Sequence, residues 1–208
     1  MRLHIGLLLT LFLTLATMPA TAGIVYSNGS YNGADNAWLI SSYYGNAVSN
    51  SFTITNYQFN YVTGFDMWVW EAPGDQALTV DWSVTTAEFG GFLIGGGTSS
   101  VTDQFISINQ YGYAVDKLTA SICCIGFYNG TYWFNVMNAT TAWGYFIWWD
   151  ENSGPSQASE SSVGTIPSES FDLVGYATCQ CDTPEPGSIL LLGTGLTGVL
   201  GAMRKKIF

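Results

Sequence analysis

The stretch GFDMWVW, residues 64–70, decides the fold class, because an entirely apolar set of side chains alternates along it with a set that contains an aspartate. Successive side chains of a strand point to opposite faces of a sheet, so the stretch predicts a β-strand with one face in the core. The predicted core face carries Phe65, Met67 and Val69. The opposite face carries Asp66, Trp68 and Trp70.

A second stretch, TYWFNVM at residues 131–137, divides in the same way. The predicted core set is Tyr132, Phe134 and Val136, and the outer set is Trp133, Asn135 and Met137. Both stretches are rich in aromatic and β-branched residues, which favour strands. Two such strands, far apart in the sequence, predict a sheet that is held together by non-local pairing.

Five further runs have the same character and are separated by turn-forming residues. They are SFTIT (51–55), ALTVDWSV (77–84), QFISI (104–108), GYFIWW (144–149) and SFDLVGY (170–176). Many short strands predict an all-β domain, an antiparallel β-sandwich of jelly-roll type, with a β-barrel as the alternative. The triple glycine at 95–97 predicts a break between strands, and the composition of 151–170 predicts a long surface loop.

Charge is distributed unevenly along the chain. Of the five Lys and Arg residues, against 15 Asp and Glu, only Lys117 lies outside the terminal segments. Nucleic-acid binding requires clustered cations that replace counterions, so nucleic acid is excluded as a partner. The single histidine, His4, lies in the N-terminal segment. The rest of the chain therefore has no imidazole for a Ser-His-Asp or Cys-His system, or for histidine-bound zinc.

Residues 1–22 have the order of a secretory signal peptide. Arg2 supplies the positive charge, LHIGLLLTLFLTLA the apolar stretch and ATA at 20–22 the cleavage site. The alternative, a retained transmembrane anchor, is less favoured because the apolar stretch is shorter than the roughly 20 residues of a span. Residues 23–182 then form one exported β-sandwich domain, long enough to bury a core.

Four cysteines fit an exported protein, in which thiols pair as disulfides. They form two groups, the adjacent Cys123 and Cys124, and Cys179 with Cys181. We predict disulfides between the two groups, because a bond between adjacent residues is strained. A four-thiolate metal site is the alternative, although such sites usually have two residues between their cysteines.

The outer faces of the first two stretches indicate a binding surface. Asp66, Trp68, Trp70 and Trp133 place indole rings near polar groups. Flat aromatic rings pack against the C–H faces of sugars, while sugar hydroxyl groups reach the polar neighbours. These four residues are therefore a candidate carbohydrate site. The alternative is that the tryptophans belong to the core or are covered by loops.

Asp150, Glu151 and Asn152 place three oxygen donors at the exit of a predicted strand. Carboxylate and amide oxygens at a turn are ligands that calcium accepts, so the three residues are a candidate calcium site, although the EF-hand spacing is absent. The alternative is that they bind backbone N–H groups of the turn. No other cofactor is expected.

The tail TPEPGSILLLGTGLTGVLGAMRKKIF, residues 183–208, is unlike the rest of the chain. It contains, in order, Pro184, Glu185 and Pro186, an apolar run at 189–203, and the cations Arg204, Lys205 and Lys206. With its flanks the run is long enough to cross a bilayer as a helix, and the positive-inside rule keeps its basic end in the cytoplasm.

This tail resembles the C-terminal sorting region of the PEP-CTERM proteins of Gram-negative bacteria, which combine these three parts with an N-terminal signal peptide. The resemblance implies that an exosortase is a partner, which recognises Pro184 to Pro186 and releases the domain from its anchor. It also implies transient attachment to the inner membrane through the C-terminal helix, followed by a location on the cell surface or outside the cell.

The resulting functional prediction is a non-catalytic surface or matrix protein, associated with exopolysaccharide or biofilm and able to bind carbohydrate. The alternative from another class is a secreted glycan hydrolase that uses two carboxylates. Such an enzyme requires two facing carboxylates about 5 to 10 Å apart in a cleft. The sequence does not single out such a pair.

Overall fold

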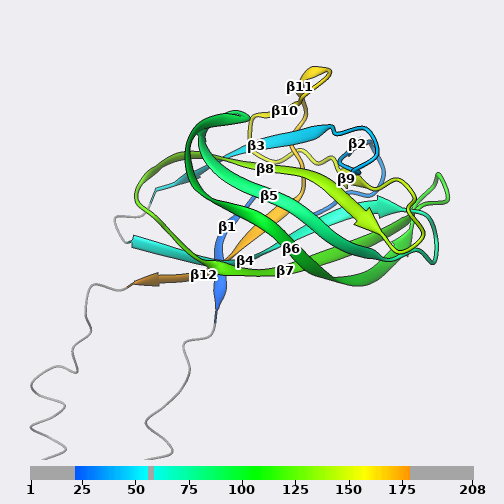
Figure 1. The fold of residues 1–208 in the computed structure, drawn as a ribbon, viewed down its shortest axis with the longest axis horizontal. Helices are drawn as coiled ribbons and strands as arrows, with labels where there is room; N and C mark the ends of the chain where they lie inside the picture. Colours follow the sequence, from blue (N-terminus) through cyan, green and yellow to red (C-terminus); the bar gives the residue numbers. More distant parts are fainter. Residues whose placement is uncertain (1–21, 56–58, 179–208) are drawn as a thin grey trace, which may run out of the picture. The chain divides into compact units, whose positions relative to one another are not determined.

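The computed structural model describes residues 22–55 and 59–178, which form strands and no helix (Figure 1). The all-β prediction is confirmed. Residues 1–21 of the predicted signal peptide and the whole predicted C-terminal helix lie outside the described residues. Within the described part, no helix is able to cross a membrane.

In chain order the strands are β1 (Gly23–Ser27), β2 (Ala37–Leu39), β3 (Ala47–Ile54), β4 (Phe59–Glu71), β5 (Ala77–Ala87), β6 (Gly90–Ile108), β7 (Ala114–Phe127), β8 (Gly130–Thr141), β9 (Trp148–Asp150), β10 (Ala158–Glu160), β11 (Gly164–Ile166) and β12 (Phe171–Thr178).

These strands form one curled antiparallel sheet. Their order is β1-β12-β4-β7-β6-β5-β8-β3-β10-β11. Strand β9 lies outside this order: it pairs with β4 on one side and with β2 on the other. The sheet curls into half a barrel, so that β4 and β8 face each other across the interior, where Phe65 and Phe134 lie 5.1 Å apart between ring centroids (Figure 1). The structure thus shows an antiparallel curled sheet and does not confirm the predicted jelly-roll sandwich.

Strand β6 is shared by the two halves of the curled sheet. It is 19 residues long and pairs with β5 along its first part and with β7 along its second. A Cβ on Gly95 would lie 2.6 Å from Ile125 Cγ2, and one on Gly96 would lie 2.9 Å from the carbonyl oxygen of Trp82. The predicted break at 95–97 is wrong, because these glycines lie inside a strand and allow neighbouring groups to approach closely.

Aromatic side chains fill the interior of the curl. Phe134 of β8 lies 5.3 Å from Phe171 of β12 and 5.7 Å from Trp149 of β9, between ring centroids. All three are fully buried. Burial of such large apolar rings is the main favourable contribution to folding. The predicted inward positions of β4 are confirmed, since Phe65, Met67 and Val69 are each 0% exposed. In β8, Phe134 and Val136 are buried and Tyr132 is half-buried.

Residues 151–170 are not the predicted surface loop. They contain β10 and β11, and β10 extends the sheet by pairing with β3. Two of their polar groups bind one buried side chain: Asn50 Oδ1 accepts from Ser156 Oγ at 3.1 Å and from Glu169 N at 2.9 Å. The composition was misleading because serine and asparagine can be buried when their hydrogen bonds are satisfied.

Candidate functional site

Four loops meet at one end of the curled sheet, on the right of Figure 1. They are residues 40–46, 72–76, 109–113 and 142–147. Two of them are joined by hydrogen bonds, from Ala142 N to the carbonyl oxygen of Gln76 at 2.8 Å and from Trp143 N to Asp75 Oδ1 at 3.0 Å. Strand β4 ends here, which brings Trp70 and Glu71 to the same place. We call this region the loop end.

Aromatic rings cross the loop end in a continuous series of contacts. Trp70 lies 5.7 Å from Tyr111 and 6.3 Å from Tyr113, between ring centroids. Tyr113 lies 5.2 Å from Trp148, which lies 5.8 Å from Phe146. Phe146 in turn lies within 6 Å of both tyrosines of the loop 40–46. We call this set the aromatic strip: Tyr43, Tyr44, Trp70, Tyr111, Tyr113, Phe146 and Trp148.

The aromatic strip is open to solvent over most of its length. Tyr43 is 76% exposed and Tyr111 is 59% exposed. Trp70, in contrast, is 6% exposed, and its Nε1 donates a hydrogen bond to Asp150 Oδ1, which fixes the orientation of the indole. Large rings that are exposed together, rather than singly, are typical of interaction surfaces.

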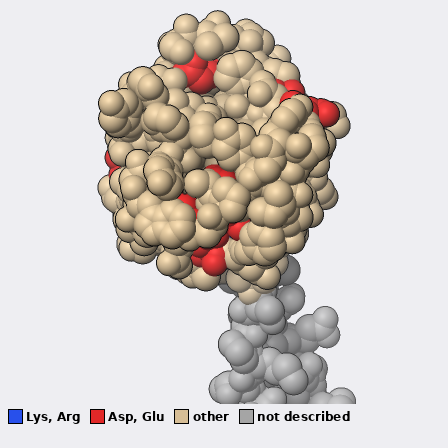
Figure 2. Space-filling model, turned by 90° about the vertical axis from the view of Figure 1, so that its right-hand side faces the viewer, with Lys and Arg blue, Asp and Glu red and all other residues tan. Residues whose placement is uncertain are grey.

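The loop end carries acidic groups and no basic ones. In Figure 2, which faces this end, Asp and Glu atoms lie between uncharged side chains, and no Lys or Arg atom is seen. The described residues contain a single cation, Lys117, and its Nζ lies 2.7 Å from Asp66 Oδ2 on the outer face of β4. The acids of the loop end therefore have no ion-pair partner within the described chain.

Two of the four predicted carbohydrate residues lie side by side on the outer face of β4. The ring of Trp68 is stacked on Tyr31 at 6.2 Å, and Lys117 Nζ lies 5.5 Å from the Trp68 ring centroid. Asp66 binds Lys117 and also accepts a hydrogen bond from Thr119 Oγ1 at 2.6 Å. These polar groups are already paired with one another.

The other two predicted residues lie elsewhere. Trp70 belongs to the aromatic strip. Trp133 lies on the outer face of β8, opposite Ser51 of β3. Because Phe65 and Phe134 meet across the core, the outward side chains of β4 and β8 leave the sheet on opposite sides. The structure therefore does not bring Trp133 onto a common surface with the tryptophans of β4.

Two of the three predicted calcium residues bind the chain's own N–H groups. Asp150 Oδ2 accepts from Asn32 N and Asp150 Oδ1 from Gly33 N, each at 3.0 Å. Glu151 Oε2 accepts from Trp38 Nε1, also at 3.0 Å. Burial raises the pKa of Asp150 to about 6, although these hydrogen bonds oppose the increase.

Asn152, the third, has the same kind of role. Its Nδ2 donates to the carbonyl oxygen of Asn28 at 2.9 Å, and its Oδ1 accepts from Gly154 N at 2.9 Å. These contacts hold the segment 28–33 against the chain that follows β9. Of these hydrogen bonds, only the one from Gly154 N to Asn152 Oδ1 lies within the turn, as the alternative interpretation expects, and the bonds of Asp150 and Glu151 go to distant segments.

Glu169 is a buried acid that sequence reasoning did not identify. Its side chain is 0% exposed, and within the described chain neither carboxylate oxygen has a hydrogen-bond partner. Burial, and then the nearby charges of Glu151 and Asp150, raise the pKa of Glu169 well above its usual value. Glu169 therefore keeps its proton to a higher pH than an exposed glutamate does.

Three further carboxylates converge inside the loop end. Glu71 of β4, Asp103 of β6 and Asp116 of β7 each offer an oxygen within 4.8 Å of the others, and we call them the acidic triad. Strand β7 lies between β4 and β6, so Asp116 is the central member. Glu71 is 0% exposed, Asp116 is buried, and Asp103 is partly exposed and opens the group to solvent.

The acidic triad lacks a compensating positive charge. Asp103 Oδ2 accepts a hydrogen bond from Ala77 N at 2.8 Å, but neither oxygen of Glu71 has a partner in the described chain. Burial, and then Asp103, raise the pKa of Glu71 to about 10. Burial also raises the pKa of Asp116 to about 6. Carboxylates held this close require a shared proton or a bound cation between them.

Sequence reasoning missed the acidic triad because its members are distant in the sequence. One signal was available: Glu71 continues the alternation that places Phe65, Met67 and Val69 in the core. An acid at an inward position of a strand needs a partner. Its position marks it as a functional candidate, although the sequence does not reveal the other two members.

The described cysteines lie on β7. Cys123 and Cys124 are exposed, and within the described residues neither forms a disulfide. Cys124 Sγ lies 3.8 Å from the hydroxyl oxygen of Tyr176, near the end of β12. Cys179 and Cys181 lie outside the described residues, so the disulfides between the two groups remain a prediction.

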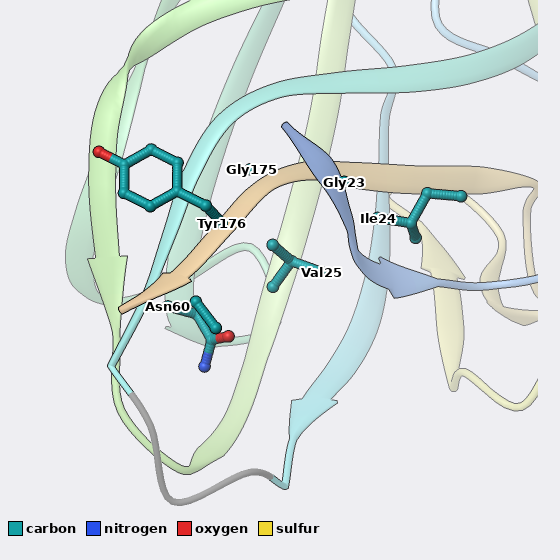
Figure 3. Close-up of a pocket in the computed structure, with 7 residues that line it drawn as sticks. Gly23, Ile24, Val25, Asn60, Gly175 and Tyr176 are labelled. Carbon is teal, nitrogen blue, oxygen red and sulfur yellow. The ribbon is translucent and has the colours of Figure 1, made fainter. Parts of the chain in front are cut away.

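A hollow of about 300 Å³ lies beside β1 and β12, near the start of β4 (Figure 3). Val25, Asn60 and Tyr176 are among the residues that line it, and the lining contains no acidic, basic or thiol group. The hollow lies at the opposite end of β4 from Trp70 and Glu71. It adds no chemistry to that of the loop end.

The predicted sorting residues Pro184 to Pro186 and Arg204 to Lys206 lie outside the described residues, and sequence comparison identifies their segment. A family model, the PEP-CTERM protein-sorting motif, matches residues 182–206. No curated protein matches the chain. The chain therefore carries a PEP-CTERM protein-sorting motif at its C-terminus. This motif supports the conclusion that the protein is exported and is sorted by an exosortase.

Proposed function

We propose that this exported protein is a non-catalytic polysaccharide-binding protein of the cell surface or extracellular matrix, and that it binds through the aromatic strip. The observation that carries the proposal is the continuous series of ring contacts from Tyr111 to Tyr43, in which the rings on the loops are exposed, Trp148 is half-buried and Trp70 is buried. Rings in a row can pack against successive sugar units of one chain. The exported location supplied by the sorting motif matches such a ligand.

Electrostatics favours a neutral polysaccharide over an acidic one. Lys117 is the single cation of the described domain and is already paired with Asp66. A polymer rich in carboxylate groups would be repelled by the surplus of Asp and Glu at the loop end. We therefore assign neutral hexose polymers as the ligand class. This class includes neutral exopolysaccharide made by the cell that exports the protein.

The geometry of the acidic triad gives no support to the alternative of glycoside hydrolysis. A hydrolase needs its two carboxylates about 5 to 10 Å apart, with the sugar or a water between them. The three groups of the triad approach within 4.8 Å of one another, and Glu71 is fully buried. A sugar ring has no room between such closely spaced groups.

The proposal is tested by affinity electrophoresis of the full-length chain through gels that contain neutral polysaccharide. Tyr44→Ala and Phe146→Ala should each weaken retention about fivefold, or about 1 kcal/mol, the scale of one aromatic contact. Tyr128→Ala is the matched control, because Tyr128 is 72% exposed but lies at the far end of β7. Equal losses for Tyr128→Ala and Tyr44→Ala, or no retention of the parent chain on any neutral polymer, would contradict the proposal.

A further inference from the structure

The acidic triad contains negative charge that the described chain does not balance. Lys117 lies next to Asp116 in the sequence, but it points to the outer face of β7, where it pairs with Asp66. Asp116 points to the inner face, towards Glu71. Both oxygens of Glu71 lack a hydrogen-bond donor although its side chain is 0% exposed. Buried polar atoms in proteins are nearly always satisfied, so these oxygens need either a proton shared with Asp103 and Asp116 or a bound cation.

The spacing of the oxygens suits a single metal ion. Oxygens bound to one Ca²⁺ at about 2.4 Å can lie at most about 4.8 Å from one another. The three residues each offer an oxygen within that limit. Two carboxylates of the triad are buried, and the partly exposed Asp103 provides the side from which an ion and its water ligands can enter.

The ligand set indicates which ion. All three residues offer only oxygen, which excludes the nitrogen and sulfur ligands that zinc and copper prefer. Calcium takes six to eight oxygens in irregular geometry, whereas magnesium needs a near-ideal octahedron and retains several waters. We propose that the acidic triad binds one Ca²⁺, with Glu71 and Asp116 as buried ligands and Asp103 as the ligand on the solvent side.

A calcium ion in this place would act on the proposed binding surface. The three ligands come from β4, β6 and β7, so one ion joins three neighbouring strands at their common end. Glu71 follows Trp70 directly, and the loop 109–113 between β6 and β7 carries Tyr111 and Tyr113. The ion therefore holds together the strands that position one half of the aromatic strip.

The test is calcium titration of the full-length chain after treatment with EDTA, followed by calorimetry and thermal melting. Extracellular calcium sites have dissociation constants of about 0.1 to 1 mM, so the titration extends to about 10 mM. We expect one ion per chain and, at 10 mM, which is about 10 to 100 times the dissociation constant, a rise in Tm of about 3 to 10 °C. Mg²⁺ at the same concentration should give a smaller rise.

Variants separate the acidic triad from the general acidity of the chain. Glu71→Gln and Asp103→Asn should each abolish the calcium-dependent rise in Tm, and Asp103→Asn keeps an oxygen that can accept from Ala77 N. Glu88→Gln, which changes an exposed acid, should leave the rise unchanged. The proposal is overturned if the parent chain shows no response to calcium, if Mg²⁺ acts equally, or if Glu88→Gln removes the rise as fully as Glu71→Gln.

Discussion

The replacement Glu169→Gln should stabilise the protein by an amount that grows with pH. Glu169 is 0% exposed, has no hydrogen-bond partner for either oxygen in the described chain, and lies near Glu151 and Asp150. Because its pKa is raised in the folded chain, the folded protein holds a proton that the unfolded chain releases above about pH 4.5. The free energy of unfolding of the parent chain therefore falls as pH rises through this range.

The magnitude follows from the one proton involved. Between the unfolded and folded pKa values, each pH unit costs the parent about 1.4 kcal/mol, and a glutamine at 169 does not titrate. The difference in the free energy of unfolding, variant minus parent, should therefore rise by about 1.4 kcal/mol for each pH unit above about pH 4.5, until Glu169 of the folded protein also releases its proton. Since Gln keeps the size of Glu, packing adds only an offset that does not depend on pH.

The assay is chemical denaturation followed by tryptophan fluorescence, in EDTA, at several pH values from about 4.5 to 7.5, the range over which the linkage applies. Glu88→Gln is the control, because Glu88 is exposed and its replacement should give a difference that is flat with pH. A flat difference for Glu169→Gln as well would show that Glu169 titrates normally in the folded chain. The reasoning from burial would then be refuted.

Three other predictions concern separate parts of the molecule. Trp70→Phe removes the indole N–H that Asp150 accepts and should cost about 1 to 3 kcal/mol of folding free energy, measured by denaturant titration; a change below about 0.5 kcal/mol would show that the hydrogen bond contributes little. Cysteines of protein recovered from the periplasm or medium should resist alkylation under denaturing conditions until a reductant is added, and two or more reactive thiols without reductant would contradict the predicted disulfides. Mass spectrometry of surface or released protein should find a new C-terminus near Pro186, whereas recovery of Phe208 would argue for a permanent anchor.

The strongest strands could be predicted from sequence because aromatic and β-branched residues alternate along them. The stretches at 64–70 and 131–137 fall inside β4 and β8, and five of the six predicted core residues are buried while Tyr132 is half-buried. Strand β7 was not predicted, because its inward positions include two alanines and the acid Asp116, which blur the alternation. The same acid belongs to the acidic triad, so the local pattern fails at a candidate site.

The candidate sites could be predicted only in fragments. Trp70 was predicted as a carbohydrate-binding residue, which stays a prediction, and its contacts Tyr111 and Tyr113 lie on a loop whose position depends on the curl of the sheet. Asp66 and Trp133 both point outwards, and the sequence does not reveal that the outer faces of their strands lie on opposite sides of the domain. Asp150 was identified as an oxygen donor, while its hydrogen bonds to Asn32 and Gly33 join segments more than one hundred residues apart.

The antiparallel pairing of β1 with β12 has a consequence for where the described chain ends. Gly23 lies opposite Gly175, and the carbonyl of Tyr61, at the start of β4, lies close to Gly175. The chain therefore leaves the described domain beside the beginning of β4, whereas the aromatic strip starts at Trp70 near its end. At about 3.4 Å per residue, these points on β4 are separated by roughly 30 Å. Thr178, the last residue that the structure describes, thus lies at the end of the sheet remote from the aromatic strip.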